Sequence, residues 1–97
     1  MSKSILQSEK KCFLTGRTDN LELHHVVYGR GNRKMSEKYG LKVWVWSELH
    51  GAGKDPNSIH NRPNEGYDLL LKQLAERAFN EKYSNEDFIK IFGRSYL

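Results

Sequence analysis

The four histidines of this 97-residue chain are its best candidates for chemistry, and all of them lie between residues 24 and 60. His24 and His25 are adjacent, whereas His50 and His60 belong to a later segment rich in glycine, proline and asparagine. Imidazole is a good ligand for borderline divalent metal ions, and in its neutral form it is also a general base near neutral pH. The histidines therefore predict a metal site, a proton-transfer site, or both.

A loop of glycines and cations follows the histidine pair. Gly29, Gly31 and Asn32 suit a loop, because glycine allows backbone conformations that let a ligand approach closely. Four cations are expected to contact phosphates, and they are Arg30, Arg33, Lys34 and Lys38. The whole net charge of +4 lies in residues 24–62, where seven lysines and arginines accompany three acidic residues. This distribution is typical of a segment that binds a polyanion, and it fits a solvated loop equally well.

The adjacent histidines are expected to do different work. In a strand, Glu22 and His24 point to one face while Leu23 and His25 point to the other. Hydrolysis of a phosphodiester needs a base that activates water and a positive charge near the leaving oxygen, so each histidine can serve one need. The alternative is structural, with one ring half-buried and the other exposed. For His60 taken alone, a polar turn residue is the preferred interpretation.

Two strands are expected to position the pair. Residues 42–46 are rich in β-branched and aromatic side chains, and should form an antiparallel hairpin with residues 21–27. Trp44 and Trp46 share one face of their strand, and this face is expected to pack on a helix of residues 67–78. The other interpretation is that the tryptophans stack on nucleic-acid bases.

Helices are expected on either side of the second strand. Ser36 should cap a single helical turn that Gly40 ends, and a helix should span about residues 65–83. Residues 84–87 resemble a capping box for a last helix, which Gly93 stops. The expected buried stripe of the long helix is Tyr67, Leu70, Leu71, Leu74, Ala75 and Ala78, with Asp68, Lys72, Gln73, Glu76 and Arg77 in water.

The chain is expected to form one domain over residues 1–97, with residues 65–97 as its helical part. Residues 1–11 should form an arm that either packs through its apolar residues or frays. Cys12 is the only cysteine, which excludes an internal disulfide and a four-cysteine zinc knuckle, and it is expected in the core. The sequence lacks an apolar signal region and a membrane-spanning run, so a cytoplasmic protein without a membrane contact is expected.

The order of these motifs resembles the HNH, or ββα-metal, endonucleases. The matching features are Leu-x-His-His-Val, a basic glycine loop, a strand, Glu-x-His, and a long loop ending in Ile-His-Asn. The likeness runs from Cys12 to the end of the chain, and is to small phage and prophage HNH proteins related to the Ref recombination nuclease. It implies an α+β fold with an antiparallel β-hairpin, a long loop and helix, and C-terminal helices.

The resemblance also implies a role for each histidine. His24, His50 and His60 would bind a divalent ion such as Mg²⁺, Mn²⁺, Ni²⁺ or Zn²⁺, and His25 would be the general base. The protein would then be a phage or prophage endonuclease in a bacterial host. It would cut single- or double-stranded DNA to 5′-phosphate and 3′-hydroxyl ends, alone or with a recombinase or another phage DNA-processing protein.

The chain departs from the HNH pattern in three places. The Cys-x-x-Cys pairs that hold a structural zinc in many HNH proteins are missing, so no structural zinc is expected. Phage relatives commonly carry a second adjacent histidine pair where this chain has Leu49-His50. The central asparagine of the HNH pattern is also missing from its usual place, and Asn32 is the candidate to replace it. Two alternatives to the enzyme follow. One is an inert HNH-like module that binds nucleic acid or protein, with the histidines as a structural metal site, and the other is a metal-free interaction domain.

Overall fold

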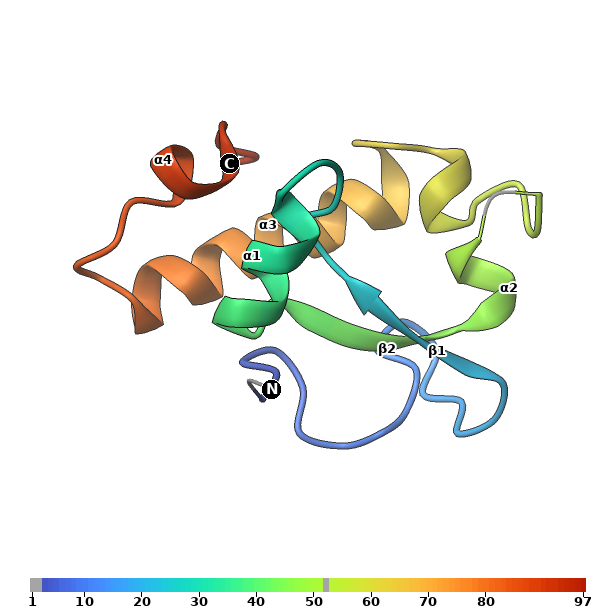
Figure 1. The fold of residues 1–97 in the computed structure, drawn as a ribbon. Coiled ribbons are helices and arrows are strands. Elements are labelled where there is room, and N and C mark those ends of the chain that lie inside the picture. Colours follow the sequence, from blue (N-terminus) through green and yellow to red (C-terminus); the bar gives the residue numbers. More distant parts are fainter. Residues whose placement is uncertain (1–2, 52) are drawn as a thin grey trace.

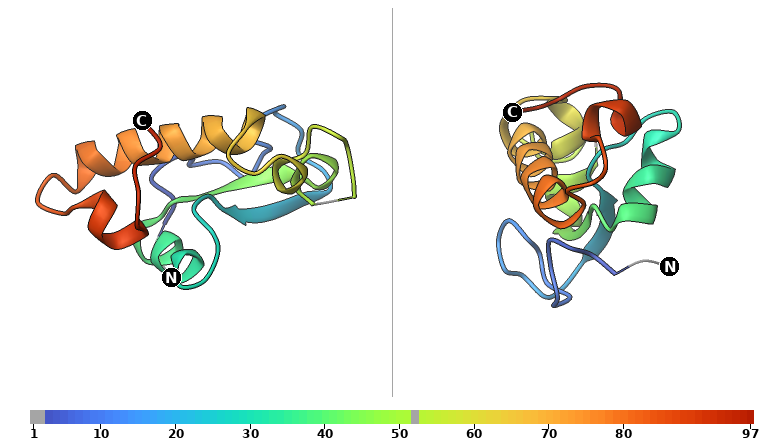
Figure 2. Two further views of the ribbon diagram at one scale, coloured as in Figure 1. Left: turned by 90° about the horizontal axis from the view of Figure 1, so that it is seen from above. Right: turned by 90° about the vertical axis from the view of Figure 1, so that its left-hand side faces the viewer.

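The computed structural model describes residues 3–51 and 53–97, and it has an α+β fold (Figure 1). A two-stranded antiparallel sheet lies between the long helix α3 (Gly66–Lys82) and the N-terminal segment (residues 3–20), as the side view in Figure 2 also shows. The elements in order are β1 (Leu21–His25), α1 (Asn32–Tyr39), β2 (Lys42–Trp46), α2 (Ser47–His50), the 3₁₀ turn η1 (Ile59–Asn61), α3 (Gly66–Lys82) and α4 (Phe88–Phe92). None of the helices within the described residues has both the length and the apolar character to cross a bilayer.

The two strands pair as the sequence predicts, with helix α1 inserted in their connection. Leu21 lies opposite Trp46 at one end of the sheet and His25 lies opposite Lys42 at the other. The first strand is shorter than expected because Val26 leaves the ladder, although its N–H still donates to the Leu41 carbonyl at 2.9 Å. The antiparallel pairing is confirmed, and it fixes which side chains share a face.

The face that carries the tryptophans is not the one that packs on α3, so this prediction was wrong. Val43 and Val45 are buried on the opposite face, together with Leu71, Ala75 and Phe79 of α3. Trp44 and Trp46 are only partly buried, and their rings lie against Lys10 and Arg17 of the N-terminal segment. The compact β-branched valines fill the sheet–helix layer, and the larger rings lie outside it.

Helix α1 begins earlier than the sequence predicts. Asn32 is already helical, and Gly31, with φ of 82°, precedes it as the N-cap residue. Ser36 is inside the helix and does not cap it, because its hydroxyl donates to the Val27 carbonyl at 2.6 Å and accepts the Val27 N–H at 3.2 Å. Gly40 ends the helix in the left-handed conformation as expected. The serine therefore ties α1 to the end of β1.

Helix α3 lies within the predicted range, but its buried stripe differs from the expected one. Tyr67 and Leu70 are 36% and 46% exposed, whereas Asp68, Lys72 and Glu76 are almost completely buried. Burial of a charge is tolerated when it is paired and hydrogen-bonded. Lys72 Nζ lies 2.8 Å from Asp68 Oδ2, and the carboxylate of Glu76 accepts hydrogen bonds from the C-terminal segment, from Ser95 Oγ and the Tyr96 N–H.

The last helix, α4, also begins differently from the prediction. Asp87 is its N-cap, and its carboxylate accepts the N–H groups of Ile89 and Lys90. Ser84, the expected capping residue, is not the cap. Gly93 stops the helix, as predicted.

The outer edge of β2 is covered by the N-terminal segment, of which residues 1 and 2 lie outside the described part. Ser4 Oγ donates to the Lys42 carbonyl at 2.6 Å, and the Trp44 N–H donates to Gln7 Oε1 at 2.8 Å. Ser4 and Gln7 therefore hold this part of the expected arm against the sheet, whereas residues 8–11 are exposed. Cys12 is buried, as predicted, and its sulfur accepts the N–H of Trp46 at 3.2 Å.

Candidate metal centre and histidine cavity

Three of the four histidines converge although they come from three different elements. His24 lies on β1, His50 ends α2, and His60 lies in η1. Each offers one ring nitrogen, and these three atoms lie within 4.8 Å of one another. The histidines are therefore close enough together to hold a metal ion. His60, which its loop sequence alone predicts to be a polar turn residue, lies beside the other two.

The geometry of His24 and His50 fits two ligands of one ion. His24 Nδ1 lies 3.2 Å from His50 Nε2. Two nitrogens bound at about 2.0–2.1 Å to a tetrahedral ion are separated by about 3.3 Å, so the observed spacing suits a shared ion. The other ring nitrogen of His24, Nε2, is buried and has no hydrogen-bond partner among the described residues. Three protein ligands that leave a fourth position open are typical of catalytic zinc sites.

The electrostatics of the cluster keep its buried histidine neutral. His24 is 2% exposed, and its pKa is lowered to about 2, first by burial and then by the neighbouring His50 and His60. The pKa of His60 is also lowered, mainly by burial. Neutral imidazole is the form that binds a metal ion, because the ligand nitrogen must carry a free lone pair.

Glu22 is a member of the site that the sequence analysis did not identify. Its Oε1 lies 2.7 Å from His50 Nδ1. A carboxylate at this position favours the tautomer with the proton on Nδ1, so that Nε2 faces His24 with its lone pair. The alternation of β1 already places Glu22 and His24 on one face, but nothing local to the sequence places His50 beside them.

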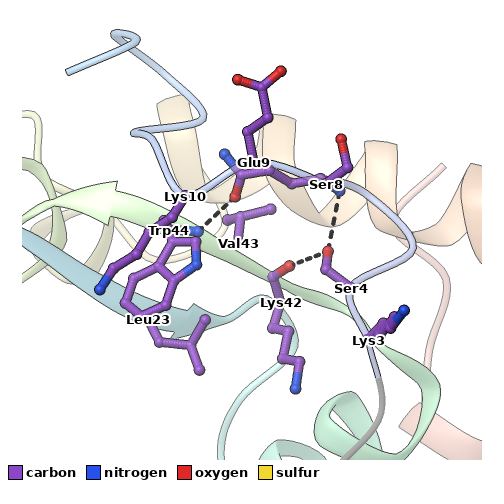
Figure 3. Close-up of a pocket in the computed structure, with 10 residues that line it drawn as sticks. Lys3, Ser4, Ser8, Glu9, Lys10, Leu23, Lys42, Val43 and Trp44 are labelled. Atoms are coloured by element: carbon purple, nitrogen blue, oxygen red, sulfur yellow. Dashed lines mark hydrogen bonds between the residues drawn. The ribbon is translucent and has the colours of Figure 1, made fainter. Parts of the chain in front are cut away.

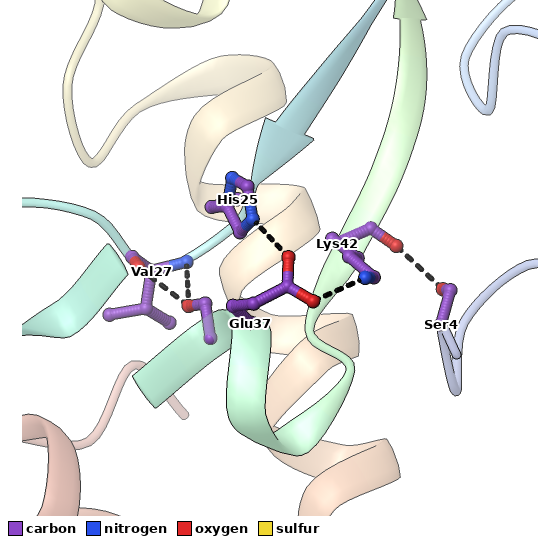
Figure 4. Close-up of polar contacts among 6 residues, drawn as sticks. Ser4, His25, Val27, Glu37 and Lys42 are labelled. Carbon is purple, nitrogen blue, oxygen red and sulfur yellow. Dashed lines mark hydrogen bonds and ion pairs between the residues drawn. The ribbon is translucent and has the colours of Figure 1, made fainter. Parts of the chain in front are cut away.

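His25 lies on the opposite face of β1 and has its own carboxylate partner (Figure 4). Its Nε2 is 2.8 Å from Glu37 Oε1, and the second oxygen of Glu37 is 2.6 Å from Lys42 Nζ. The hydrogen bond from Lys42, followed by that from His25, lowers the pKa of Glu37 to about 2. Glu37 is therefore ionised at neutral pH, and it favours a His25 ring with the proton on Nε2 and the lone pair on Nδ1.

A small cavity of about 230 Å³ joins the two histidine environments. It is lined by all four histidines together with Leu23, Tyr28 and Arg33. A neighbouring cavity of about 510 Å³ is lined by His25, Gly31, Arg33, Lys34 and Glu37. Arg33 lines both cavities, so it is a cation that borders the joined site.

The other residues predicted for phosphate contact or loop structure do not line these two cavities. Arg30 is exposed before α1, and Lys38 is exposed on α1 with its ammonium 5.3 Å from the Tyr39 ring centre. Gly29 adopts a positive φ of 100°, as the loop prediction requires. Asn32 donates from Nδ2 to the Phe92 carbonyl at 3.4 Å, so its side chain contacts α4.

A buried polar network supports the cluster from the side of α3. Lys72 Nζ lies 4.4 Å from the ring centre of Tyr28, and this ring is 4.6 Å from the ring of His60. Lys72 also donates to Asn64 Oδ1 at 2.8 Å, which connects α3 to the loop that follows η1. Burial and the nearby Asp68 raise the pKa of the Tyr28 hydroxyl above its usual range. The charged residues inside α3 thus hold the segment that carries His60.

Comparisons with known proteins add no family to this description. No protein-family model matches the chain, and no curated protein sequence or solved structure matches it either. The function is therefore inferred from the geometry of the site.

Proposed function

We propose that this protein is a metal-dependent DNA endonuclease of the HNH, or ββα-metal, type. The observation that carries the proposal is one cavity lined by three converging histidines and by a fourth histidine that a carboxylate orients. The strand–helix–strand segment that carries the histidine pair, with a following turn that supplies His60, is compatible with this type of fold.

The ligand set favours a borderline transition metal ion over Mg²⁺. His24, His50 and His60 all offer imidazole nitrogen, which suits Zn²⁺ or Ni²⁺ better than Mg²⁺ or Mn²⁺, ions that prefer oxygen ligands and water. A bound ion would supply positive charge to the scissile phosphate and to the leaving oxygen.

His25 is the proposed general base. Glu37 holds the Nε2 side of its ring, so Nδ1 is the nitrogen that takes a proton from the attacking water. The ionised carboxylate also stabilises the imidazolium that results from this transfer. Lys42 donates from its ammonium group to Glu37, and this contact orients the carboxylate and favours its ionised form.

Arg33 and Lys34 are the proposed phosphate contacts, because they line the cavity next to His25. Their contribution should be electrostatic and independent of base sequence. Replacement of Arg33 by glutamine is expected to weaken DNA binding uniformly across sequences, and to reduce the slope of log K against log salt by roughly 1. Titrations at several salt concentrations measure this slope, and an unchanged slope would remove Arg33 from the interface.

Nicking of supercoiled plasmid tests the proposal directly. The wild-type protein, loaded with Mn²⁺, Ni²⁺ or Zn²⁺ in turn, is expected to nick or linearise the plasmid, and His25→Gln should lose this activity while retaining metal. Lys90→Gln, which removes an exposed cation on α4 that lines neither histidine cavity, is the control and should cut normally. If no metal supports cutting while the ion still stabilises the protein, the histidines form a structural site and the protein is an inert module.

A further inference from the structure

The sheet face opposite α3 continues from His25 as a row of apolar and aromatic side chains. Because directly opposed residues in antiparallel strands share a face, the register places three pairs in line. These pairs are His25 with Lys42, Leu23 with Trp44, and Leu21 with Trp46. The general base proposed above is therefore at one end of a row that contains both tryptophans.

Each tryptophan in this row has a cation against its ring. Lys10 Nζ is 4.5 Å from the ring centre of Trp44, and the guanidinium of Arg17 is 4.3 Å from that of Trp46. The two tryptophans are two residues apart on one strand, which separates their side chains by about 7 Å. Aromatic rings that alternate with cations at this spacing are suited to bases and phosphates of successive nucleotides in an extended strand.

The first of these rings borders a pocket of about 530 Å³ between β2 and the N-terminal segment (Figure 3). Trp44 and Leu23 lie on one side of it and Lys3 on the other, while the carboxylate of Glu9 points away from Trp44. Leu23 also lines the histidine cavity, so the pocket and the candidate site share a wall.

From this arrangement we infer that the tryptophan face binds a single-stranded polynucleotide that leads to the histidine cavity. One base stacks on Trp44, and Lys10 moves from the ring to the neighbouring phosphate, with Lys3 on the far side of the pocket. Trp46 with Arg17 receives the next nucleotide. The inference rests on the proposed function, because it names the form of the substrate that the same site would cut.

A single strand is favoured over a duplex because only unpaired bases expose faces for stacking. The partial exposure of Trp44 supports this use, since the sheet–helix core is already filled by the valines of β2. Stacking accepts every base, so the pocket should bind with little sequence preference.

Fluorescence anisotropy of labelled oligonucleotides, measured with EDTA present, tests the inference without any turnover. The probes are oligothymidylate, oligouridylate and a duplex of equal length. The wild-type protein should bind at least one of the single strands more tightly than the duplex. Trp44→Leu should weaken this binding about tenfold. Lys10→Gln should also weaken it and lower the salt dependence, whereas Lys90→Gln should do neither.

Two results would overturn the inference. One is tighter binding of the duplex than of either single strand, and the other is unchanged single-strand affinity in Lys10→Gln, a surface variant that keeps the core intact. Thermal melting of Trp44→Leu shows whether its loss of binding reflects unfolding. The binding assay contains chelator, so its result does not depend on whether the protein nicks plasmid. Conversely, loss of the single-strand inference would leave the metal-dependent nicking of plasmid as a separate observation.

Discussion

Metal binding by the three histidines should appear as a large gain in thermal stability. An ion that binds only the folded state stabilises it by about 2.7 kcal/mol at one hundred times its dissociation constant. For a chain of this size, each kcal/mol shifts the melting temperature by roughly 4–8 °C. Zinc in that excess should therefore raise the melting temperature by about 11–22 °C over the EDTA-treated protein.

The position of each histidine decides which variant tests this gain. His24 is 2% exposed, so its removal would destabilise the protein even without metal. His50 is only half-buried, and His50→Gln keeps a polar side chain while removing a ligand. This variant should melt near the EDTA-treated wild type and lose most of the zinc-dependent shift. His25→Gln, the matched control on the opposite strand face, should retain the shift in full.

Differential scanning calorimetry with and without zinc measures the shift, and elemental analysis of the dialysed protein gives the bound metal. Equal shifts in the wild type and His50→Gln would refute the assigned ligand set. No shift in the wild type, together with no bound metal, would refute the metal centre itself and favour the metal-free interaction domain.

Three further predictions concern the carboxylates and the buried lysine. Glu37→Gln should destabilise the protein by about 1–3 kcal/mol near neutral pH, because Lys42 loses its partner. The difference should vanish as pH falls from 4.5, the usual pKa of Glu37, towards its folded value of about 2, as urea titrations at several pH values would reveal. Lys72→Met should cost about 3–5 kcal/mol in the same assay, since it leaves the buried Asp68 carboxylate uncompensated, and adding Asp68→Leu should recover most of the loss. Glu22→Gln should weaken zinc binding about 10–100-fold in a competition titration, without loss of secondary structure by circular dichroism.

The strands and α3 could be predicted from the sequence because their signals are local. The β-branched and aromatic run of β2 and the helical periodicity after Gly66 each suffice to define an element. The shared ligand set of His24, His50 and His60 was predicted through the resemblance, because their convergence depends on α2 and η1 bringing His50 and His60 back to β1. This long-range placement has no signal in residue spacing.

Polar partners account for most of what the sequence could not indicate. Asp68 and Lys72 have the character of surface residues, and their burial is compensated by their mutual contact and by their hydrogen bonds to Asn64. Ser36 has the character of a helix cap, yet its hydroxyl bonds to the backbone of Val27. In each case the deciding partner comes from the folded arrangement, so hydrophobic pattern alone assigns the wrong face or the wrong role.

The cover on the outer edge of β2 has a consequence for self-association. A two-stranded sheet leaves free hydrogen-bonding groups on each outer edge, and such edges recruit strands from other molecules. Here Ser4, Gln7 and Cys12 occupy those groups with side-chain atoms, and Phe13 adds a backbone N–H at 2.8 Å from the Trp44 carbonyl. The N-terminal segment, which is not itself a strand, thereby covers the edge of β2. This cover should prevent the edge from pairing with strands of other molecules.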